Sequence, residues 1–216
     1  MSSQRLAGKV LHRVAGKPML KYLIERLDFC KTVKDIVIAT SIEKSDDPIA
    51  SFCDDYGIKF YRGSLNNVAL RFKEVLDIYK FDTFIRTNAD SPLLDFNLIN
   101  RAIKYLRNGD YDIVTNAFPR SFPVGQSVEV IRTSTFEQAY EKMSKPAHFE
   151  HITKYYYEHS EEFRINNFSN DKDLSSYRLV VDTPEDLKRI EKIIGSMTRP
   201  HTEYGMDELI ELYPSV

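Results

Sequence analysis

The sequence has little cysteine, no excess charge of either sign and no long apolar run, and each shortage excludes a class of protein. Cys30 and Cys53 lie in apolar positions of helix-like segments, so we expect reduced core thiols rather than a disulfide or a metal site. Thirty basic and thirty-two acidic residues give a net charge of −2, which argues against bulk binding of nucleic acid. No segment suits a membrane span or a signal peptide, so we expect no membrane insertion and a cytoplasmic location.

Helix and strand patterns alternate along residues 18–115. Pro18 suits a first helical position, and leucines and isoleucines at helix spacing follow it. Further helices are expected at 47–57, 68–79 and 95–109, and strands at 35–40, 58–61, 81–86 and 113–115. This alternation is typical of βαβ units and predicts an α/β fold with a mostly parallel sheet covered on both faces. Ligands of such sheets bind beyond the carboxyl ends of the strands.

The second half of the chain has a looser pattern. An alternating strand is expected at 127–132, and three consecutive tyrosines at 155–157 are expected to pack or to line a cleft. No repeat or low-complexity linker is present, so residues 1–216 are expected to form one domain with an inserted sugar-binding lobe around 116–178. The remaining expected elements are helices near 134–143 and 149–159, a strand at 178–181, a helix from Thr183-Pro184-Glu185 and a short helix within 200–216.

Cations and carboxylates follow the apolar runs at three places. Arg5 and Lys9 flank Gly8, whose backbone can approach a ligand closely. Asp90 and Asp182 each stand at the end of an expected strand. Lysine and arginine bind phosphate, and carboxylate oxygens are the ligands that Mg²⁺ prefers. Together these residues predict a site for a metal-bound nucleoside triphosphate.

Seven short pieces, in order along the chain, carry a resemblance to a known family: Arg5-Leu6-Ala7-Gly8-Lys9, Gly16-Lys17-Pro18-Met19, Tyr61-Arg62-Gly63-Ser64, Asn88-Ala89-Asp90-Ser91-Pro92-Leu93, Val128-Glu129-Val130, Glu150-His151-Ile152-Thr153 and Val181-Asp182-Thr183-Pro184-Glu185-Asp186-Leu187. From residue 1 to about residue 195 the sequence resembles the sugar cytidylyltransferases. It is most similar to the spore coat polysaccharide biosynthesis protein F group, and CMP-Kdo and acylneuraminate cytidylyltransferases are more distant.

The resemblance implies a fold and a reaction. The fold would be that of the nucleotide-diphospho-sugar transferases (GT-A-like and Rossmann-like), with a doubly wound mixed sheet. A sugar hydroxyl would attack the α-phosphorus of CTP, forming a CMP-sugar and releasing pyrophosphate with Mg²⁺ required. The implied partners are CTP and a sugar or sugar acid for surface polysaccharide synthesis, and relatives often pair as homodimers.

The resemblance also implies roles for individual residues. Arg5 and Lys9 would be catalytic and, with Gly8, would hold the triphosphate and offset charge on the leaving pyrophosphate. Asp90 and Asp182 would be catalytic Mg²⁺ ligands that position the α-phosphorus. The nucleotide would also contact Lys17, Arg71 and Asn88, and the sugar substrate would contact Glu129, Glu150 and His151.

Each of these residues has a purely structural alternative. The basic turn and Arg71 are equally typical of solvated surface, and Lys17 suits surface and phosphate roles alike. Asp90 and Asp182 also suit turn and helix-cap positions. Asn88 suits a loop-fixing role, Glu129 an exposed strand position, and His151 a structural one. The family pattern has glycine where this sequence has Ala89, which requires a backbone angle there that an alanine can adopt.

The beginning of the sequence departs furthest from the family. A family member should open with an apolar central strand ending in the phosphate loop, whereas this sequence starts inside that loop at Met1-Ser2-Ser3-Gln4. Loss of such a strand would cost on the order of several kcal/mol in unpaired backbone groups. We expect Met1 to be an internal methionine of a longer product, and the alternative is a short protein that compensates in another way.

Two other functions remain open from the sequence. A glycosyltransferase of similar fold would carry an Asp-X-Asp metal motif, which Asn88-Ala89-Asp90 only partly resembles. A non-catalytic nucleotide-binding relative is the other, suggested by the missing strand. The sugar and the choice of nucleotide are also open.

Overall fold

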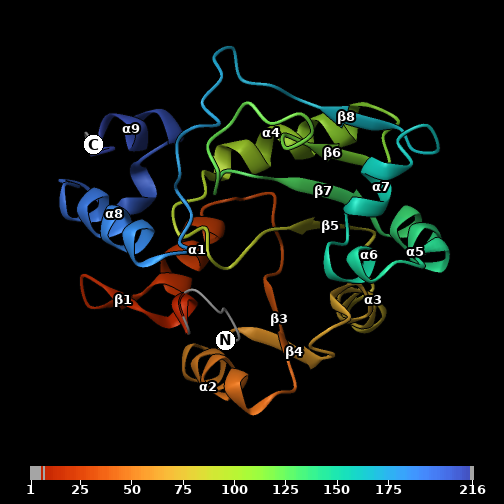
Figure 1. The fold of residues 1–216 in the computed structure, drawn as a ribbon, viewed down its shortest axis with the longest axis horizontal. Coiled ribbons are helices and arrows are strands. Elements are labelled where there is room, and N and C mark those ends of the chain that lie inside the picture. The colour runs from red at the N-terminus through yellow and green to blue at the C-terminus, as the bar shows by residue number, and fades with distance from the viewer. Residues whose placement is uncertain (1–5, 7, 215–216) are drawn as a thin grey trace.

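The computed structural model describes residue 6 and residues 8–214 (Figure 1). Its strands are β1 (Arg13–Val14), β2 (Lys17–Pro18), β3 (Val37–Ser41), β4 (Lys59–Gly63), β5 (Thr83–Arg86), β6 (Ile113–Thr115), β7 (Glu129–Arg132) and β8 (Ile165–Asn167). Its helices are α1 (Met19–Asp28), α2 (Asp47–Tyr56), α3 (Val68–Tyr79), α4 (Phe96–Asn108), α5 (Thr133–Lys142), α6 (Pro146–Glu150), α7 (Lys154–Glu158), α8 (Pro184–Gly195) and α9 (Met206–Glu211). Three short 3₁₀ turns cover Lys9–Leu11, Lys44–Asp46 and His201–Glu203.

The larger strands form two sheets. β3 and β4 pair in parallel, and a four-stranded sheet has the order β5-β7-β6-β8. Within it β7 runs antiparallel to both β5 and β6, while β6 and β8 are parallel. The α/β prediction is confirmed, but the expectation of a mostly parallel sheet is wrong because β7 inserts between two parallel strands. In the described part of the chain no strand joins β3 to β5.

Helix ends follow the signals in the sequence. Gly57 ends α2 with φ 64°, a left-handed conformation that glycine adopts without a steric penalty. Asp95 begins α4, and its side chain accepts a hydrogen bond from the Asn97 N–H at 2.8 Å. Thr183 and Asp186 form a reciprocal capping box at the start of α8. The predictions for these three helices are confirmed.

Three predictions for the second half are wrong. The segment 149–159 forms two helices, because His151 after α6 has non-helical φ/ψ of −118° and 87°. The strand β7 is buried on both faces rather than alternating. The segment 178–181 is no strand: Leu179 donates its N–H to Val124 and Val181 donates its N–H to Asp90, so its partners come from two separate loops.

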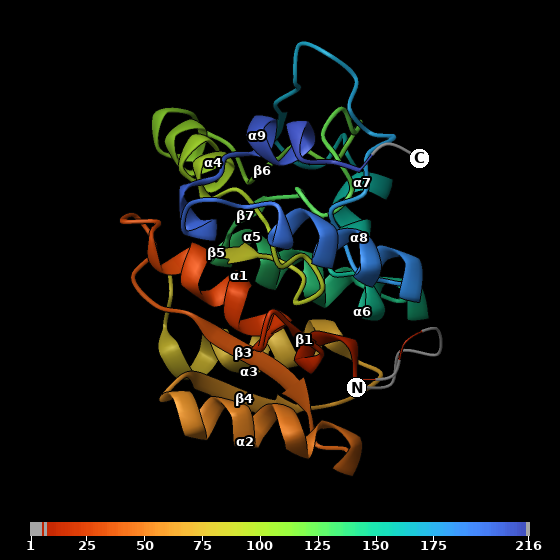
Figure 2. The ribbon, with the colours of Figure 1, turned by 90° about the vertical axis from the view of Figure 1, so that its left-hand side faces the viewer.

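The helix α1 connects the parts of the core. Figure 2 shows it in the middle of the molecule, between the β3–β4 pair and the four-stranded sheet. Its Leu23 packs with α4 and the large sheet, its Tyr22 with α8, and its Ile24 with α2. Its Arg26 is fully buried and donates hydrogen bonds to the carbonyl oxygens of Leu94, His201 and Tyr204. This arginine therefore ties the C-terminal segment to the core.

Two expectations about composition can be compared with the fold. Cys30 and Cys53 are both free and buried, as predicted. Among the described helices, none is both long and apolar enough to cross a membrane.

Candidate active site

One lysine lies between two aspartates that are far away in the sequence. The Nζ of Lys9 is 2.7 Å from Asp90 Oδ2 and 2.8 Å from Asp182 Oδ1. All three side chains are partly exposed, at 15%, 21% and 22%. Three of the residues predicted to be catalytic thus meet at one accessible point, while Arg5 lies outside the described residues.

Local structure explains how these three residues meet. Gly8 has φ 68°, a left-handed conformation, and starts the 3₁₀ turn that carries Lys9. Asp90 follows the carboxyl end of β5, and its carbonyl oxygen accepts the N–H of Val181 at 2.9 Å. This hydrogen bond holds Val181, the residue before Asp182, beside Asp90. Ala89 is not among the residues with positive φ, so its methyl group is tolerated where the family has glycine.

The two carboxylates stabilise the charged form of Lys9. Burial would lower the pKa of Lys9, but its hydrogen bonds to Asp182 and Asp90 outweigh burial and raise the pKa above its usual value. The ammonium is therefore charged at neutral pH.

Asp186, a buried aspartate with no site role predicted from the sequence, holds the backbone of Asp182 in place. Asp186 Oδ2 accepts the backbone N–H of Asp182 at 3.1 Å, and Arg178 and Arg189 donate to the same carboxylate. Burial would raise the pKa of Asp186, but the hydrogen bonds of the two arginines and of the Asp182 N–H lower it below its usual range. The pattern Thr183-X-X-Asp186, a capping box, is the sequence signal that identifies it.

The Asp186→Asn variant is expected to lower the free energy of unfolding at pH 7 by about 3 kcal/mol, because it leaves two arginines without their buried counter-charge. A carboxylate whose pKa is lower in the folded than in the unfolded protein stabilises the folded state at a pH above its unfolded pKa, which is near 3.9. This contribution to the free energy of unfolding is lost as the pH falls toward the folded pKa. The difference between wild type and variant should therefore shrink below about pH 4. Urea unfolding between pH 7 and pH 3 measures it.

The control for this prediction is Glu185→Gln, since Glu185 is exposed on the same turn. This variant is expected to unfold within about 0.5 kcal/mol of wild type. If the difference in the free energy of unfolding between wild type and Asp186→Asn stays constant from pH 7 to pH 3, the ionised Asp186 carboxylate is not the stabilising group.

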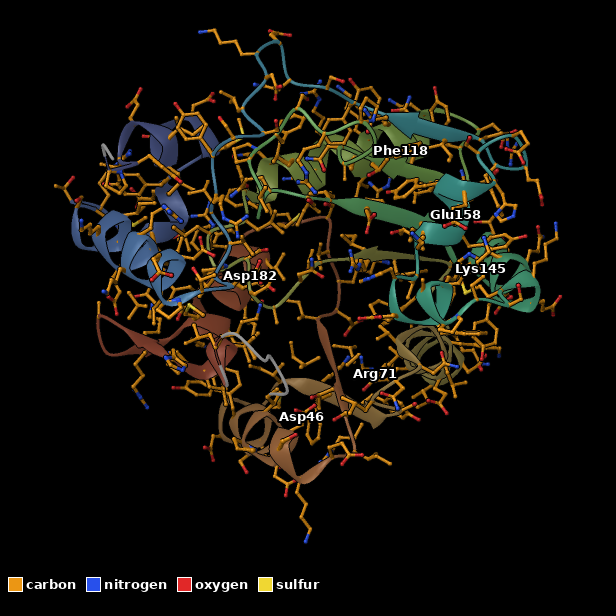
Figure 3. All side chains as sticks on the ribbon, viewed as in Figure 1. Asp46, Arg71, Phe118, Lys145, Glu158 and Asp182 are labelled. Carbon is orange, nitrogen blue, oxygen red and sulfur yellow. The ribbon has the colours of Figure 1, made fainter. Side chains whose placement is uncertain are left out.

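Arg71 lies in the first turn of α3, and Figure 3 shows it apart from Asp182, across the middle of the molecule in that view. Burial lowers the pKa of its guanidinium, and the charge of Asp46 opposes that shift. A Cβ at Gly63 would lie 2.8 Å from Arg71 Cγ, so the glycine leaves room for the arginine. Asn67 caps α3 by accepting the Leu70 N–H at 2.7 Å.

Lys17 and Asn88, two other residues predicted to contact nucleotide, have contacts with residues other than Lys9. Lys17 is 2.5 Å from Glu25 Oε2 and lies over the ring of Tyr22 at 4.7 Å. Asn88 has an exposed side chain, and its carbonyl oxygen accepts the Ser91 N–H in the turn that leads to Asp90. Neither contact tests binding of nucleotide, so both roles stay predictions.

Glu129 is buried, and the alternative of an exposed strand position is wrong. Its side chain is 4% exposed, and Oε2 accepts from Arg86 Nη1 at 3.0 Å while Oε1 accepts from the Tyr157 hydroxyl at 2.6 Å. Burial and the Glu129 charge raise the pKa of Tyr157, so it remains a protonated donor. Both partners of Glu129 face a cavity beside it.

That cavity has a volume of about 490 Å³, within the usual range for small-molecule sites. His151, a residue predicted to bind substrate, is among its lining residues, whereas Glu150 is exposed at the end of α6 and is not. Most of the other lining residues have no role that the sequence predicts, except that the tyrosines at 155–157 are expected to pack or to line a cleft. The lining residues are Arg86, Phe118, His151, Thr153, Lys154, Tyr157 and Glu158.

A larger cavity of about 630 Å³ lies at the opposite ends of the same strands, near Asp112 before β6 and Arg132 at the end of β7. Most of its charged side chains are paired with one another, while Arg132 donates to the backbone carbonyl oxygens of Tyr111 and Leu106. Arg164 Nη2 is 2.7 Å from Asp112 Oδ1, and Lys142 Nζ is 2.7 Å from Glu162 Oε2. The smaller cavity is the one at the edge that carries Asp90.

The Lys9 contacts are compatible with a magnesium site. No group of three or more metal-type side chains occurs among residues 6 and 8–214. Mg²⁺, however, is commonly bound through one or two carboxylates, with water and substrate phosphates completing its coordination. Asp90 and Asp182 both contact the Lys9 ammonium, so their carboxylates lie close enough together for one cation to contact both.

Comparisons with known proteins agree with this fold. A family model for cytidylyltransferases matches residues 1–210. The spore coat polysaccharide biosynthesis protein SpsF of Bacillus subtilis is 29% identical over 229 residues, covering 98% of this chain and 90% of that protein.

Solved structures show the same relationship. A cytidylyltransferase from Leptospira borgpetersenii superimposes with a TM-score of 0.92 at 30% identity, covering 98% of this chain and 89% of that one. A CMP:2-keto-3-deoxy-manno-octonic acid synthetase complexed with CTP shares the fold at a TM-score of 0.67 and 19% identity, with 90% and 94% covered. The chain therefore belongs to the cytidylyltransferase family and is a nucleotidyltransferase.

Proposed function

We propose that this enzyme transfers CMP from CTP to a sugar or sugar acid, releases pyrophosphate and requires Mg²⁺. The observation that carries the proposal is the Lys9 ammonium shared by Asp90 and Asp182. One cation suited to phosphate and two carboxylates suited to a metal thus occur at one point, as the proposed reaction needs. The family and the likeness to the Bacillus subtilis spore coat protein support a role in surface polysaccharide synthesis.

The proposed roles follow from charge and position. Asp90 and Asp182 would hold Mg²⁺, which when bound offsets the charge of the triphosphate and orients it. Lys9, joined by Arg5, would stabilise the pyrophosphate as it leaves. The acceptor hydroxyl forms its bond to the α-phosphorus as the bond to pyrophosphate breaks, and the hydroxyl proton passes to solvent. The cavity lined by Arg86 and His151 would hold the acceptor.

The test is pyrophosphate release with Mg²⁺, each of the four nucleoside triphosphates, and a panel containing 3-deoxy-manno-octulosonate, N-acetylneuraminate and glucosamine. We expect release with CTP and one of the panel members, and much less with the other nucleotides. Folded protein that releases no pyrophosphate with any nucleotide would contradict the proposal.

A further inference from the structure

Phe118 is an exposed aromatic ring that the fold holds in place. Its side chain is 44% exposed and stacks on Tyr157, with ring centroids 4.5 Å apart and planes 16° from parallel. Its backbone N–H donates to Asn167 Oδ1 at 3.0 Å, and Asn167 Nδ2 donates to the carbonyl oxygen of Pro119 at 3.2 Å. A side chain of β8 therefore fixes the loop that carries the exposed ring.

The stacked pair forms part of the wall of the 490 Å³ cavity. Phe118 follows β6 as Asp90 follows β5, and these two strands both run antiparallel to β7. Their carboxyl ends therefore meet at the same edge of the sheet. Arg86, which lines the cavity, is four residues before Asp90, so an extended chain would place them at most about 14 Å apart. Figure 3 shows Phe118 and Glu158 in the same part of the molecule.

The chemistry of the cavity suits a sugar. The face of an aromatic ring carries partial negative charge and attracts the weakly positive C–H groups of a pyranose face. The remaining wall offers hydrogen-bonding groups on Arg86, His151 and Thr153, which suit hydroxyl or carboxylate oxygens. Sites of this volume combine aromatic surface for affinity with a few polar groups for orientation.

We propose that Phe118 and Tyr157 form an aromatic wall against which the sugar acceptor packs, and that this wall determines which acceptors bind. The inference rests on the proposed cytidylyl transfer for the nature of the ligand. It assigns acceptor specificity to two side chains of the loop after β6 and of α7.

Glu129 accepts hydrogen bonds from Tyr157, which is part of this wall, and from Arg86. Its Oε1 fixes the hydroxyl of Tyr157 and its Oε2 fixes Arg86, so both of its oxygens are engaged by residues that line the cavity. Glu129 is therefore a positioning residue, which affects the acceptor through these two neighbours.

The kinetic test compares Phe118→Ala with Phe118→Tyr, using the panel sugar that wild type turns over fastest. Phe118→Ala is expected to raise the KM for that sugar at least tenfold, while the KM for CTP stays within about twofold. Phe118→Tyr keeps the ring and is expected to stay near wild type. Phe29→Ala is the matched control, because Phe29 is 54% exposed and packs on Phe96, away from the cavity. A rise in the KM for CTP alone would assign the ring to the nucleotide and overturn the proposal.

A binding test does not depend on turnover. The chain has no tryptophan, so Phe118→Trp introduces a single reporter in the cavity. Its emission is expected to change on titration with one of the three panel sugars, and not with Mg²⁺ and CTP alone.

The outcomes separate the two proposals. A change in Phe118→Trp emission with a sugar that the enzyme does not turn over supports the aromatic wall and contradicts cytidylyl transfer to that sugar. Suppose instead that the enzyme turns over a panel sugar, that the emission of Phe118→Trp does not change with that sugar, and that Phe118→Ala has the wild-type KM for it. This result overturns the aromatic wall but not the cytidylyl transfer. The absence of both turnover and emission change overturns both proposals.

Discussion

Replacement of Asp90 by asparagine is expected to lower kcat for CTP turnover at least 100-fold. Asparagine keeps the size of the side chain and one oxygen, but it removes a negative charge that Lys9 contacts at 2.7 Å. Loss of one group that stabilises charge in a transition state typically costs about 100-fold to 1,000-fold in kcat. Pyrophosphate release at saturating CTP, Mg²⁺ and panel sugar measures the effect.

The matched control is Asp55→Asn on the exposed face of α2, which should leave kcat unchanged. The melting temperature of Asp90→Asn should stay close to that of wild type, because Asp182 continues to pair with Lys9. A folded Asp90→Asn enzyme whose kcat is within threefold of wild type would remove Asp90 from the catalytic group.

The Lys9→Met variant should reduce kcat by about 100-fold and raise the KM for CTP. Methionine is similar in length to lysine, so the variant removes the ammonium while filling its space. The remaining carboxylates then face the triphosphate without the cation that they share in wild type. Steady-state kinetics with CTP as the varied substrate separates the two effects.

Lys31→Met provides the comparison, since Lys31 is an exposed lysine just beyond α1. It is expected to match wild type in both constants. Lys9→Met with an unchanged KM for CTP and an unchanged kcat would show that the ammonium only neutralises the aspartates in the free enzyme.

The first half of the fold could be predicted because its signals are local. Proline, glycine and capping aspartate mark the helix ends between 47 and 109, and the strands are short apolar runs between them. The antiparallel insertion of β7 and the pairing of β8 with β6 could not be predicted, since both depend on partners distant in sequence.

The grouping of Lys9 with Asp90 and Asp182 could be predicted only with help from the resemblance. Lys9 is 81 residues from Asp90 and 173 from Asp182, and no spacing rule joins them. The segment before Asp182 is not a strand, so of the two aspartates only Asp90 follows the carboxyl end of a strand. Burial of Glu129 and exposure of Phe118 are set by tertiary packing, which the alternation of residues along one strand does not show.

The capping box at Thr183 and Asp186 shows the opposite case. Its pattern is readable in the sequence as a helix start, yet the same carboxylate also holds the backbone of Asp182. A local motif thus had a second role that only the folded chain reveals.

Calorimetric titration with α,β-methylene-CTP, which cannot release pyrophosphate, tests the central claim most directly. Wild type and the double variant Asp90→Asn/Asp182→Asn would each be titrated with and without Mg²⁺. We predict that Mg²⁺ strengthens binding of the analogue at least tenfold in wild type and has little effect in the double variant. An equal gain from Mg²⁺ in both proteins would contradict a metal–triphosphate site built on these two aspartates.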